Sequence, residues 1–174
     1  MQHVALSPAG SAPSPAEVDL PKGDLTVRTI AMPADTNANG DIFGGWVLSQ
    51  MDQAGGIAGV DRAQGRVVTV ALESMTFIRP VRVGDVLCVY TRVSHVGRTS
   101  MKIEVEAWAR RFCTQVRERV TQATFTFVAI DEDHKPIPVR PLKLKTEDDR
   151  RRFAEGRRRR EVRQALAQEL GEDR

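Results

Sequence analysis

The sequence has few of the side chains on which most hydrolytic and metal-dependent enzymes depend. Its 174 residues include only three histidines and two cysteines, and no Gly-x-Ser-x-Gly motif is present. The histidines, His3, His95 and His134, are far apart in the sequence. A Ser-His or Cys-His catalytic system and a histidine-based metal site are therefore not expected. If the protein carries out chemistry, we expect a carboxylate or an amide group to do it.

The chain also lacks long apolar segments and a cysteine framework. It contains no run of about 18 apolar residues, so no membrane-spanning helix is expected. Residues 1–22 are rich in Ser, Pro and Ala and lack the pattern of a secretory signal, and we interpret them as a disordered leader. Cys88 falls in a strand-like segment and Cys113 in a connection, as is typical of free thiols in a reducing compartment. These features favour a cytoplasmic protein.

The main part of the chain has no basic excess, although the net charge is +3. Residues 1–139 carry 14 Lys and Arg against 15 Asp and Glu, whereas residues 140–174 carry 12 against 8. The positive charge therefore belongs to a basic tail at residues 143–174, whose composition predicts a helix. Acidic residues are interspersed with its arginines, which argues against a surface for nucleic acid or membrane.

Hydrophobic periodicity divides the intervening residues 23–142 into one helix and several strands. Apolar and polar residues alternate at residues 25–31, and spacings of three and four predict a helix over residues 46–60. Four further strands are predicted at residues 66–78, 86–96, 99–109 and 119–130. Alternation at residues 102–108 predicts one solvent-exposed face for that strand. We therefore expect an α+β hotdog fold, in which a curled antiparallel sheet of about five strands wraps one long central helix.

The predicted helix contains an unusual set of glycines. Leu48, Asp52, Gly55, Gly56 and Gly59 share one helical face by their spacing. Each interior glycine costs about 1 kcal/mol of helix stability relative to alanine. A glycine face allows close approach to other backbone, so we expect it to pack against the sheet with Asp52 on or beside it. The alternative is that Asp52 lies at a solvated edge of this face.

The loop that precedes the helix supplies further candidates. Asp41 competes with Asp52 as a functional carboxylate, although an Asp at this junction is commonly a helix cap. Asn37 and Asn39 are typical turn residues. The amides of Gly44 and Gly45 could hold a carbonyl oxygen or an oxyanion at the positive end of the helix dipole, or the two glycines could only allow the chain to turn.

A turn between two predicted strands contains Gly97, Arg98, Thr99 and Ser100. One arginine and two hydroxyls could bind a phosphate group, but the same spacing also suits a simple hairpin.

Taken together, four segments resemble the YciA-type acyl-CoA thioesterases of the hotdog superfamily. They are residues 32–46, 50–52, 68–75 and 96–100, and the resemblance extends over about residues 25–140 in the order and spacing of the family. The leader and the arginine-rich tail lie outside it.

The resemblance implies roles that spacing alone does not supply. It implies that Asp52 is the catalytic carboxylate and that Asn37 faces it across a subunit interface. The amides of Gly44 and Gly45 would polarise the thioester carbonyl, and the turn at residues 97–100 would form part of the CoA-binding edge. It also implies a homo-oligomer with a dimer as the minimal unit, expected here as a trimer of dimers.

The implied activity is hydrolysis of acyl-CoA to a carboxylic acid and CoA, with no metal or cofactor. Asp52 would activate water as a general base or attack the thioester directly. One rival is a hotdog enoyl-thioester dehydratase, which is disfavoured because no histidine lies near the active loop. The other is a non-catalytic acyl-CoA-binding module whose basic tail contacts nucleic acid or membrane.

Overall fold

The computed structural model describes residues 20–142 continuously. Of the C-terminal tail it describes residues 147, 150, 151, 153, 154, 157, 158, 161 and 162, all with helical backbone. The leader predicted at residues 1–22 lies almost wholly outside the described residues, and so does most of the tail predicted at residues 143–174.

The described chain forms one long helix and five strands in the predicted order. Their bounds are β1 (Asp24–Ile30), the 3-10 turn η1 (Pro33–Asp35), α1 (Gly44–Ala63), β2 (Val67–Phe77), β3 (Val86–Val96), β4 (Ser100–Arg110) and β5 (Arg117–Ala129). Every element predicted within residues 23–142 is confirmed, and each end lies within about three residues of its predicted position. The helix ends where Gln64 adopts a left-handed backbone with φ 54°.

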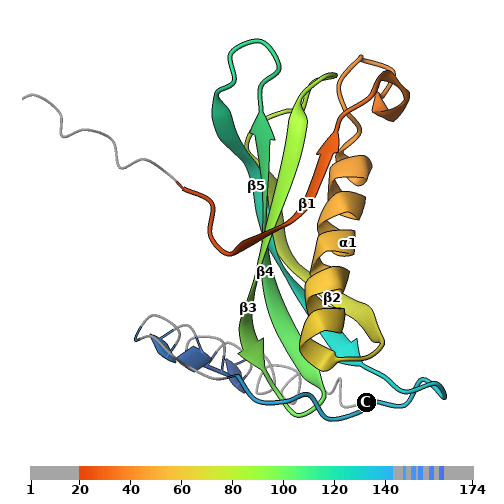
Figure 1. Cartoon of the computed structure of the whole chain (residues 1–174), viewed down its shortest axis with the longest axis vertical. Helices are drawn as coiled ribbons and strands as arrows, with labels where there is room; N and C mark the ends of the chain where they lie inside the picture. Colours follow the sequence, from red (N-terminus) through yellow and green to blue (C-terminus); the bar gives the residue numbers. More distant parts are fainter. Residues whose placement is uncertain are drawn as a thin grey trace, which may run out of the picture.

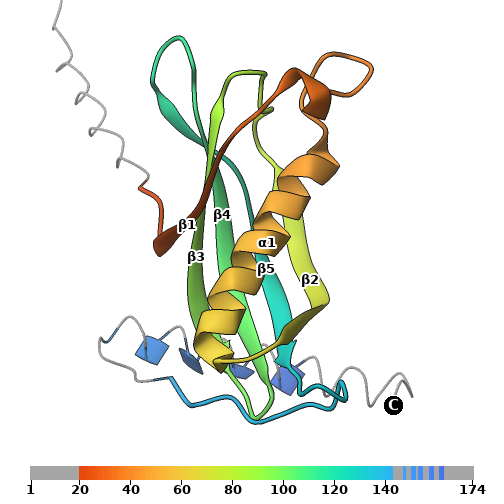
Figure 2. The same cartoon turned by 45° about the vertical axis from the view of Figure 1, so that its right-hand side comes forward.

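The five strands form one antiparallel sheet in the order β1-β3-β4-β5-β2. The sheet is strongly twisted, and α1 runs along one of its faces (Figures 1 and 2). This arrangement confirms the predicted α+β architecture. Because β2 is an edge strand, one of its sides has no neighbour within the described chain.

The hydrophobic core lies between α1 and the sheet. Alternate residues of β4, including Ile103 and Val105, face the helix and are fully buried. They pack with Phe125 and Phe127 of β5 and with Met51 of α1 in one cluster. The period of two in the strands and the period near 3.6 in the helix place these side chains in the same layer.

The opposite face of β4 is buried as well, so the predicted solvent-exposed face at residues 102–108 was wrong. Lys102 is 5% exposed and Glu106 is 7% exposed. The Lys102 Nζ lies 2.6 Å from Glu73 Oε1, and Glu106 Oε2 accepts a hydrogen bond of 2.9 Å from Trp108 Nε1. Alternation identifies polar positions, but a polar side chain that finds a partner can still be buried.

Candidate functional site

The start of α1 has two backbone amides that make no hydrogen bond within the described chain. The residue before the helix is Phe43, whose side chain makes no capping hydrogen bond. Its carbonyl accepts from the amides of Trp46 at 2.9 Å and Val47 at 3.4 Å. Within the described chain, no acceptor lies on the amides of Gly44 or Gly45. These two donors, at the positive end of the helix dipole, can therefore bind a carbonyl oxygen or an oxyanion.

The loop before the helix is held by the side chain of Asn37. Its Oδ1 accepts from the amides of Asn39 at 2.9 Å and Asp41 at 3.2 Å, and the amide of Asn37 donates to the carbonyl of Asp41 at 2.7 Å. Asn37 is thus a turn residue, as its type predicts, and its NH2 group is the part left for a ligand. Asp41 is exposed and is not the helix cap, because Phe43 holds that position.

Asp52 lies seven residues after Gly45 on α1 and is half-buried. Its Oδ1 accepts a hydrogen bond of 2.7 Å from the hydroxyl of Thr69 on β2. The structure thus places Asp52 beside the sheet, rather than at a fully solvated edge of the helix. Sequence reasoning did not single out Thr69. The only available signal was its position in residues 68–75, one of the segments that carry the family resemblance.

Two of the three glycines singled out in α1 bring the helix close to the sheet. A Cβ added at Gly55 would lie 2.8 Å from the ring of Phe127, and one added at Gly59 would lie 3.2 Å from Val67. A Cβ added at Gly56 would meet no described atom within 4 Å. The predicted glycine contact face is therefore correct for Gly55 and Gly59 and wrong for Gly56.

The turn at residues 97–100 joins β3 to β4. The amide of Gly97 donates to the carbonyl of Ser100 at 2.7 Å, and the carbonyl of Arg98 accepts from Val139 at 2.9 Å. The Arg98 side chain is exposed. This turn lies at the same end of the molecule as the C-terminus of α1, opposite to Gly44 and Gly45 (Figure 1). One chain therefore does not bring the turn together with the helix start.

A cavity of about 280 Å³ adjoins the start of α1. Gly44 and Val47 of the helix line it, together with residues from the end of β2 and the connection to β3, among them Phe77, Ile78 and Pro80. These walls are largely apolar and suit an apolar chain better than a charged group.

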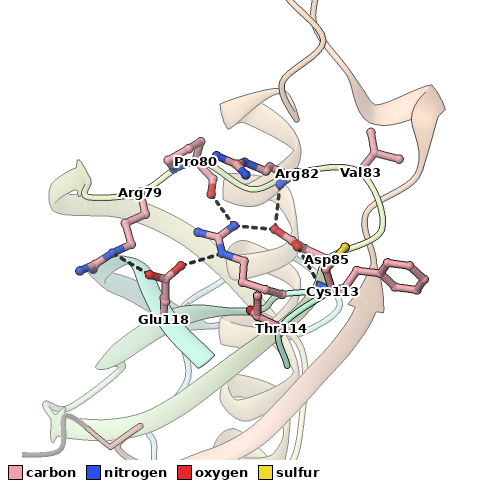
Figure 3. Close-up of a pocket in the computed structure, with 10 residues that line it drawn as sticks. Arg79, Pro80, Arg82, Val83, Asp85, Cys113, Thr114 and Glu118 are labelled. Carbon is pink, nitrogen blue, oxygen red and sulfur yellow. Dashed lines mark hydrogen bonds and ion pairs between the residues drawn. The ribbon is translucent and has the colours of Figure 1, made fainter. Parts of the chain in front are cut away.

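A second cavity of about 430 Å³ lies beyond it and contains a cluster of charged residues (Figure 3). The guanidinium of Arg111 lies 2.6 Å from both Asp85 and Glu118. Burial disfavours the charged form of Arg111, but the hydrogen bonds that it donates to Glu118 and Asp85 outweigh this effect and raise its pKa above the ordinary arginine value. Asp85 also accepts from the amides of Arg82 at 3.0 Å and Phe112 at 3.3 Å. We interpret the cluster as structural, because its ion pair between Asp85 and Arg111 joins the β2–β3 connection to the β4–β5 connection.

The described residues contain no group of three or more His, Cys, Asp or Glu side chains that could hold a metal ion. Cys88 is a buried free thiol and Cys113 an exposed one. In the described part of the chain, no helix is both long and apolar enough to cross a membrane.

Comparison with known proteins assigns this arrangement to a family. Residues 39–111 match the Thioesterase superfamily. The acyl-CoA thioester hydrolase YciA of Escherichia coli is 53% identical over 126 residues, which cover 70% of this chain and 96% of the relative. An uncharacterized acyl-CoA thioester hydrolase of Haemophilus influenzae is 57% identical over 115 residues, or 64% of this chain and 75% of the relative.

Solved structures agree with the sequence relatives. A hexameric thioesterase from Yersinia pestis is 52% identical, with a TM-score of 0.68 over 71% of this chain and 100% of its own. A hexameric broad-specificity acyl-coenzyme A thioesterase is 51% identical, with a TM-score of 0.68 over 72% of this chain and 86% of its own. The chain therefore belongs to the thioesterase superfamily of hotdog-fold proteins and, within it, to the YciA-type acyl-CoA thioester hydrolases.

Proposed function

We propose that this protein hydrolyses acyl-CoA thioesters to a free carboxylic acid and CoA. The observation that carries the proposal is the 53% identity to YciA over 96% of that enzyme's length. The described chain adds two chemical groups that this reaction needs, namely free amides at Gly44 and Gly45 and a half-buried carboxylate at Asp52. The reaction consumes only water besides the thioester and requires no metal or cofactor.

In the proposed mechanism, the thioester carbonyl oxygen lies against the amides of Gly44 and Gly45. Negative charge develops on this oxygen when the carbonyl carbon is attacked, and donors already fixed at a helix start stabilise it without reorganisation. Asp52 takes a proton from water as the water oxygen attacks the carbonyl carbon. The carbon–sulfur bond then breaks, and the proton passes to the departing CoA thiolate.

Direct attack by Asp52 through a mixed anhydride is the alternative route. The two routes differ in the source of the new oxygen atom. A single turnover in ¹⁸O-water should place the label in the released acid, whereas attack by Asp52 would place it in the carboxylate of the enzyme after the anhydride is hydrolysed on that side.

We further propose that the active enzyme is a homo-oligomer built from dimers, as a trimer of dimers. The edge strand β2 exposes three apolar side chains, with Val68 38%, Val70 54% and Leu72 41% exposed. The neighbouring helix exposes Ile57 and Val60. An apolar edge strand of 11 residues is a ready site for pairing with a second copy. Light scattering on the full chain should give the mass of six copies.

In this assembly, Asn37 and the turn at residues 97–100 act on the active site of a neighbouring copy. The NH2 group of Asn37 would orient the water or the carbonyl, and the exposed Arg98 would bind a phosphate of CoA together with the Thr99 and Ser100 hydroxyls. The proposal predicts complementation. Mixing Asp52→Asn chains with Arg98→Met chains should restore low-KM activity, because one mixed site then contains both wild-type residues.

The central experiment compares the carboxylate of Asp52 on α1 with that of Asp41 in the loop before the helix. Release of CoA is followed with a thiol reagent for the wild type, Asp52→Asn and Asp41→Asn. We expect kcat to fall at least a hundredfold for Asp52→Asn and to stay within about twofold of wild type for Asp41→Asn. Near-normal turnover by Asp52→Asn, or equal losses in both variants, would contradict the assignment of Asp52.

We also propose a cytoplasmic location. The described chain has one exposed and one buried cysteine, both free, and free thiols are typical of proteins in reducing compartments.

A further inference from the structure

The C-terminal tail is attached to the sheet beside the turn at residues 97–100. The ring of Phe153 lies against the ring of His95, with 4.7 Å between the ring centroids. Phe153 is half-buried and His95 is 6% exposed. His95 precedes Gly97 by two residues, so this contact holds the tail next to the turn. Both views show the described tail residues, in blue, at the end of the sheet where β3 ends and β4 begins (Figures 1 and 2).

The segment that leads into the tail is fixed at the same end of the molecule. The amide of Val139 donates to the carbonyl of Arg98 at 2.9 Å, which joins this segment directly to the turn. The guanidinium of Arg62, near the end of α1, donates to the carbonyls of Arg140 and Pro141. The tail is therefore held here twice, once where it begins and again at the ring contact.

Two arginines flank the ring contact. Arg150 precedes Phe153 by three residues and Arg157 follows it by four, and these spacings place helical residues on one face. Both arginine side chains are exposed. Arg157 lies 3.6 Å from Glu161, but the two side chains are 68% and 65% exposed, and so exposed a pair is weak enough for a phosphate to replace it. The side of the tail that carries Phe153 thus also carries two guanidinium groups.

We propose that Arg150 and Arg157 extend the CoA-binding edge and bind phosphate groups of CoA together with Arg98 of the turn. CoA carries a diphosphate and a separate 3′-phosphate, and a guanidinium binds one phosphate through two parallel hydrogen bonds, so separated phosphates require separate arginines. The proposal rests on the proposed acyl-CoA activity and on the proposed role of the turn. The family resemblance does not supply it, because the tail lies outside the residues that carry that resemblance.

A compact polyphosphate suits the tail better than an extended polyanion. Exposed acids, including Glu147 and Glu161, interrupt the arginines, and residues 1–139 have no basic excess that could continue the surface. A nucleic-acid duplex or a bilayer is bound over a wide basic area, which the described chain does not offer. A few arginines at one end are enough for a ligand whose phosphates belong to a single nucleotide.

The test compares four full-length variants with the wild type. The double variant Arg150→Gln/Arg157→Gln removes two charges from the side of the tail that carries Phe153. Arg151→Gln/Arg158→Gln is the matched control, because it removes the same charge from the opposite side by helical spacing. Phe153→Ala removes the ring contact, and Phe153→Tyr retains it. Oligomeric mass and thermal unfolding are measured for each variant, and the arginine pair provides the decisive comparison if Phe153→Ala assembles poorly.

The variants are assayed with two substrates that share one acyl group, butyryl-CoA and S-butyryl-pantetheine, which lacks every phosphate. We expect Arg150→Gln/Arg157→Gln to raise KM for butyryl-CoA about fivefold with kcat within about twofold of wild type, as the loss of a contact present throughout the reaction does. This rise should shrink in about 0.5 M salt. KM for S-butyryl-pantetheine should not change. Phe153→Ala should act in the same direction, whereas Phe153→Tyr and the control pair should match wild type within about twofold.

Calorimetric binding of CoA separates this inference from the proposed function, because it does not depend on turnover. If the wild type hydrolyses no thioester but Arg150→Gln/Arg157→Gln still weakens CoA binding about fivefold, the proposed function fails and the role of the tail stands. If the wild type hydrolyses butyryl-CoA and this variant has unchanged KM and CoA affinity, the inference is wrong. An equal effect from the control pair would also overturn it, since overall charge would then be the cause. Weakened binding of a short DNA duplex or of anionic vesicles, with unchanged CoA affinity, would assign the arginines to another polyanion and overturn the proposal.

Discussion

The adjacent residues Gly55 and Gly56 have opposite surroundings on α1, so replacement by alanine should have opposite effects on stability. Alanine stabilises a helix interior by about 0.8–1 kcal/mol relative to glycine, and this gain applies at both positions. At Gly55, however, the new Cβ would lie 2.8 Å from Cε2 and 2.9 Å from Cζ of Phe127, a side chain that is 1% exposed. Such a buried ring cannot move aside, and overpacking of a core costs about 1–3 kcal/mol.

The expected net effects follow from these two quantities. Gly55→Ala should destabilise the protein by about 1–2 kcal/mol, and Gly56→Ala should stabilise it by up to about 1 kcal/mol. Urea unfolding of both variants, at one fixed protein concentration because an oligomer's stability depends on it, measures the difference of about 2–3 kcal/mol. A Phe127→Leu substitution in the Gly55→Ala background should recover part of the loss. If Gly55→Ala unfolds at the same urea concentration as Gly56→Ala or at a higher one, α1 is not seated on the sheet as described.

Two further predictions concern buried ion pairs. Arg111→Met should lower the free energy of unfolding by about 2–3 kcal/mol, because it leaves the Asp85 carboxylate, 4% exposed, with only two backbone donors. The control Arg79→Met removes an ion pair in which the arginine is 48% exposed and should cost at most about 1 kcal/mol in the same urea titration. Glu73→Gln should cost more stability than Lys102→Met, because it leaves a lysine side chain that is 6% exposed without its carboxylate. Equal midpoints for these two variants would contradict that order.

The fold could be predicted from the sequence because its signals are local. The strand period of two and the helix period near 3.6 are properties of neighbouring residues, and they gave β3 at residues 86–96 without error. Burial of the second face of β4 could not be predicted, since it depends on partners such as Glu73 on β2, 29 residues away from Lys102. The glycine face was only partly predictable for a related reason. Gly55 and Gly56 are about 100° apart on the helix, and a shared face that wide can include one contact and one open position.

The candidate site was predictable in its residue types and only partly in its geometry. A free-amide helix start and one carboxylate two turns along the same helix are both encoded within residues 44–52. Thr69 was not predicted, because its contact with Asp52 depends on how closely the helix and β2 approach, which Gly55 and Phe127 determine together. Asp41 is the opposite case. Local rules make an Asp at a helix junction a cap, but the helix begins two residues later than that rule requires, after Phe43.

The separation between the two ends of α1 gives a structural reason for the proposed sharing of the active site between two copies. A helix of 20 residues spans about 30 Å, with Gly44 and Gly45 at one end and the turn at residues 97–100 beside the other. A single chain therefore has the proposed carbonyl site at one end and the proposed phosphate contact at the other. If two copies pair antiparallel along β2, the helix start of one copy lies at the end of the dimer that holds the turn of its partner. The apolar side chains exposed on β2 would then join the two copies. This pairing would place the proposed phosphate contact of one copy at the same end of the dimer as the helix amides of the other.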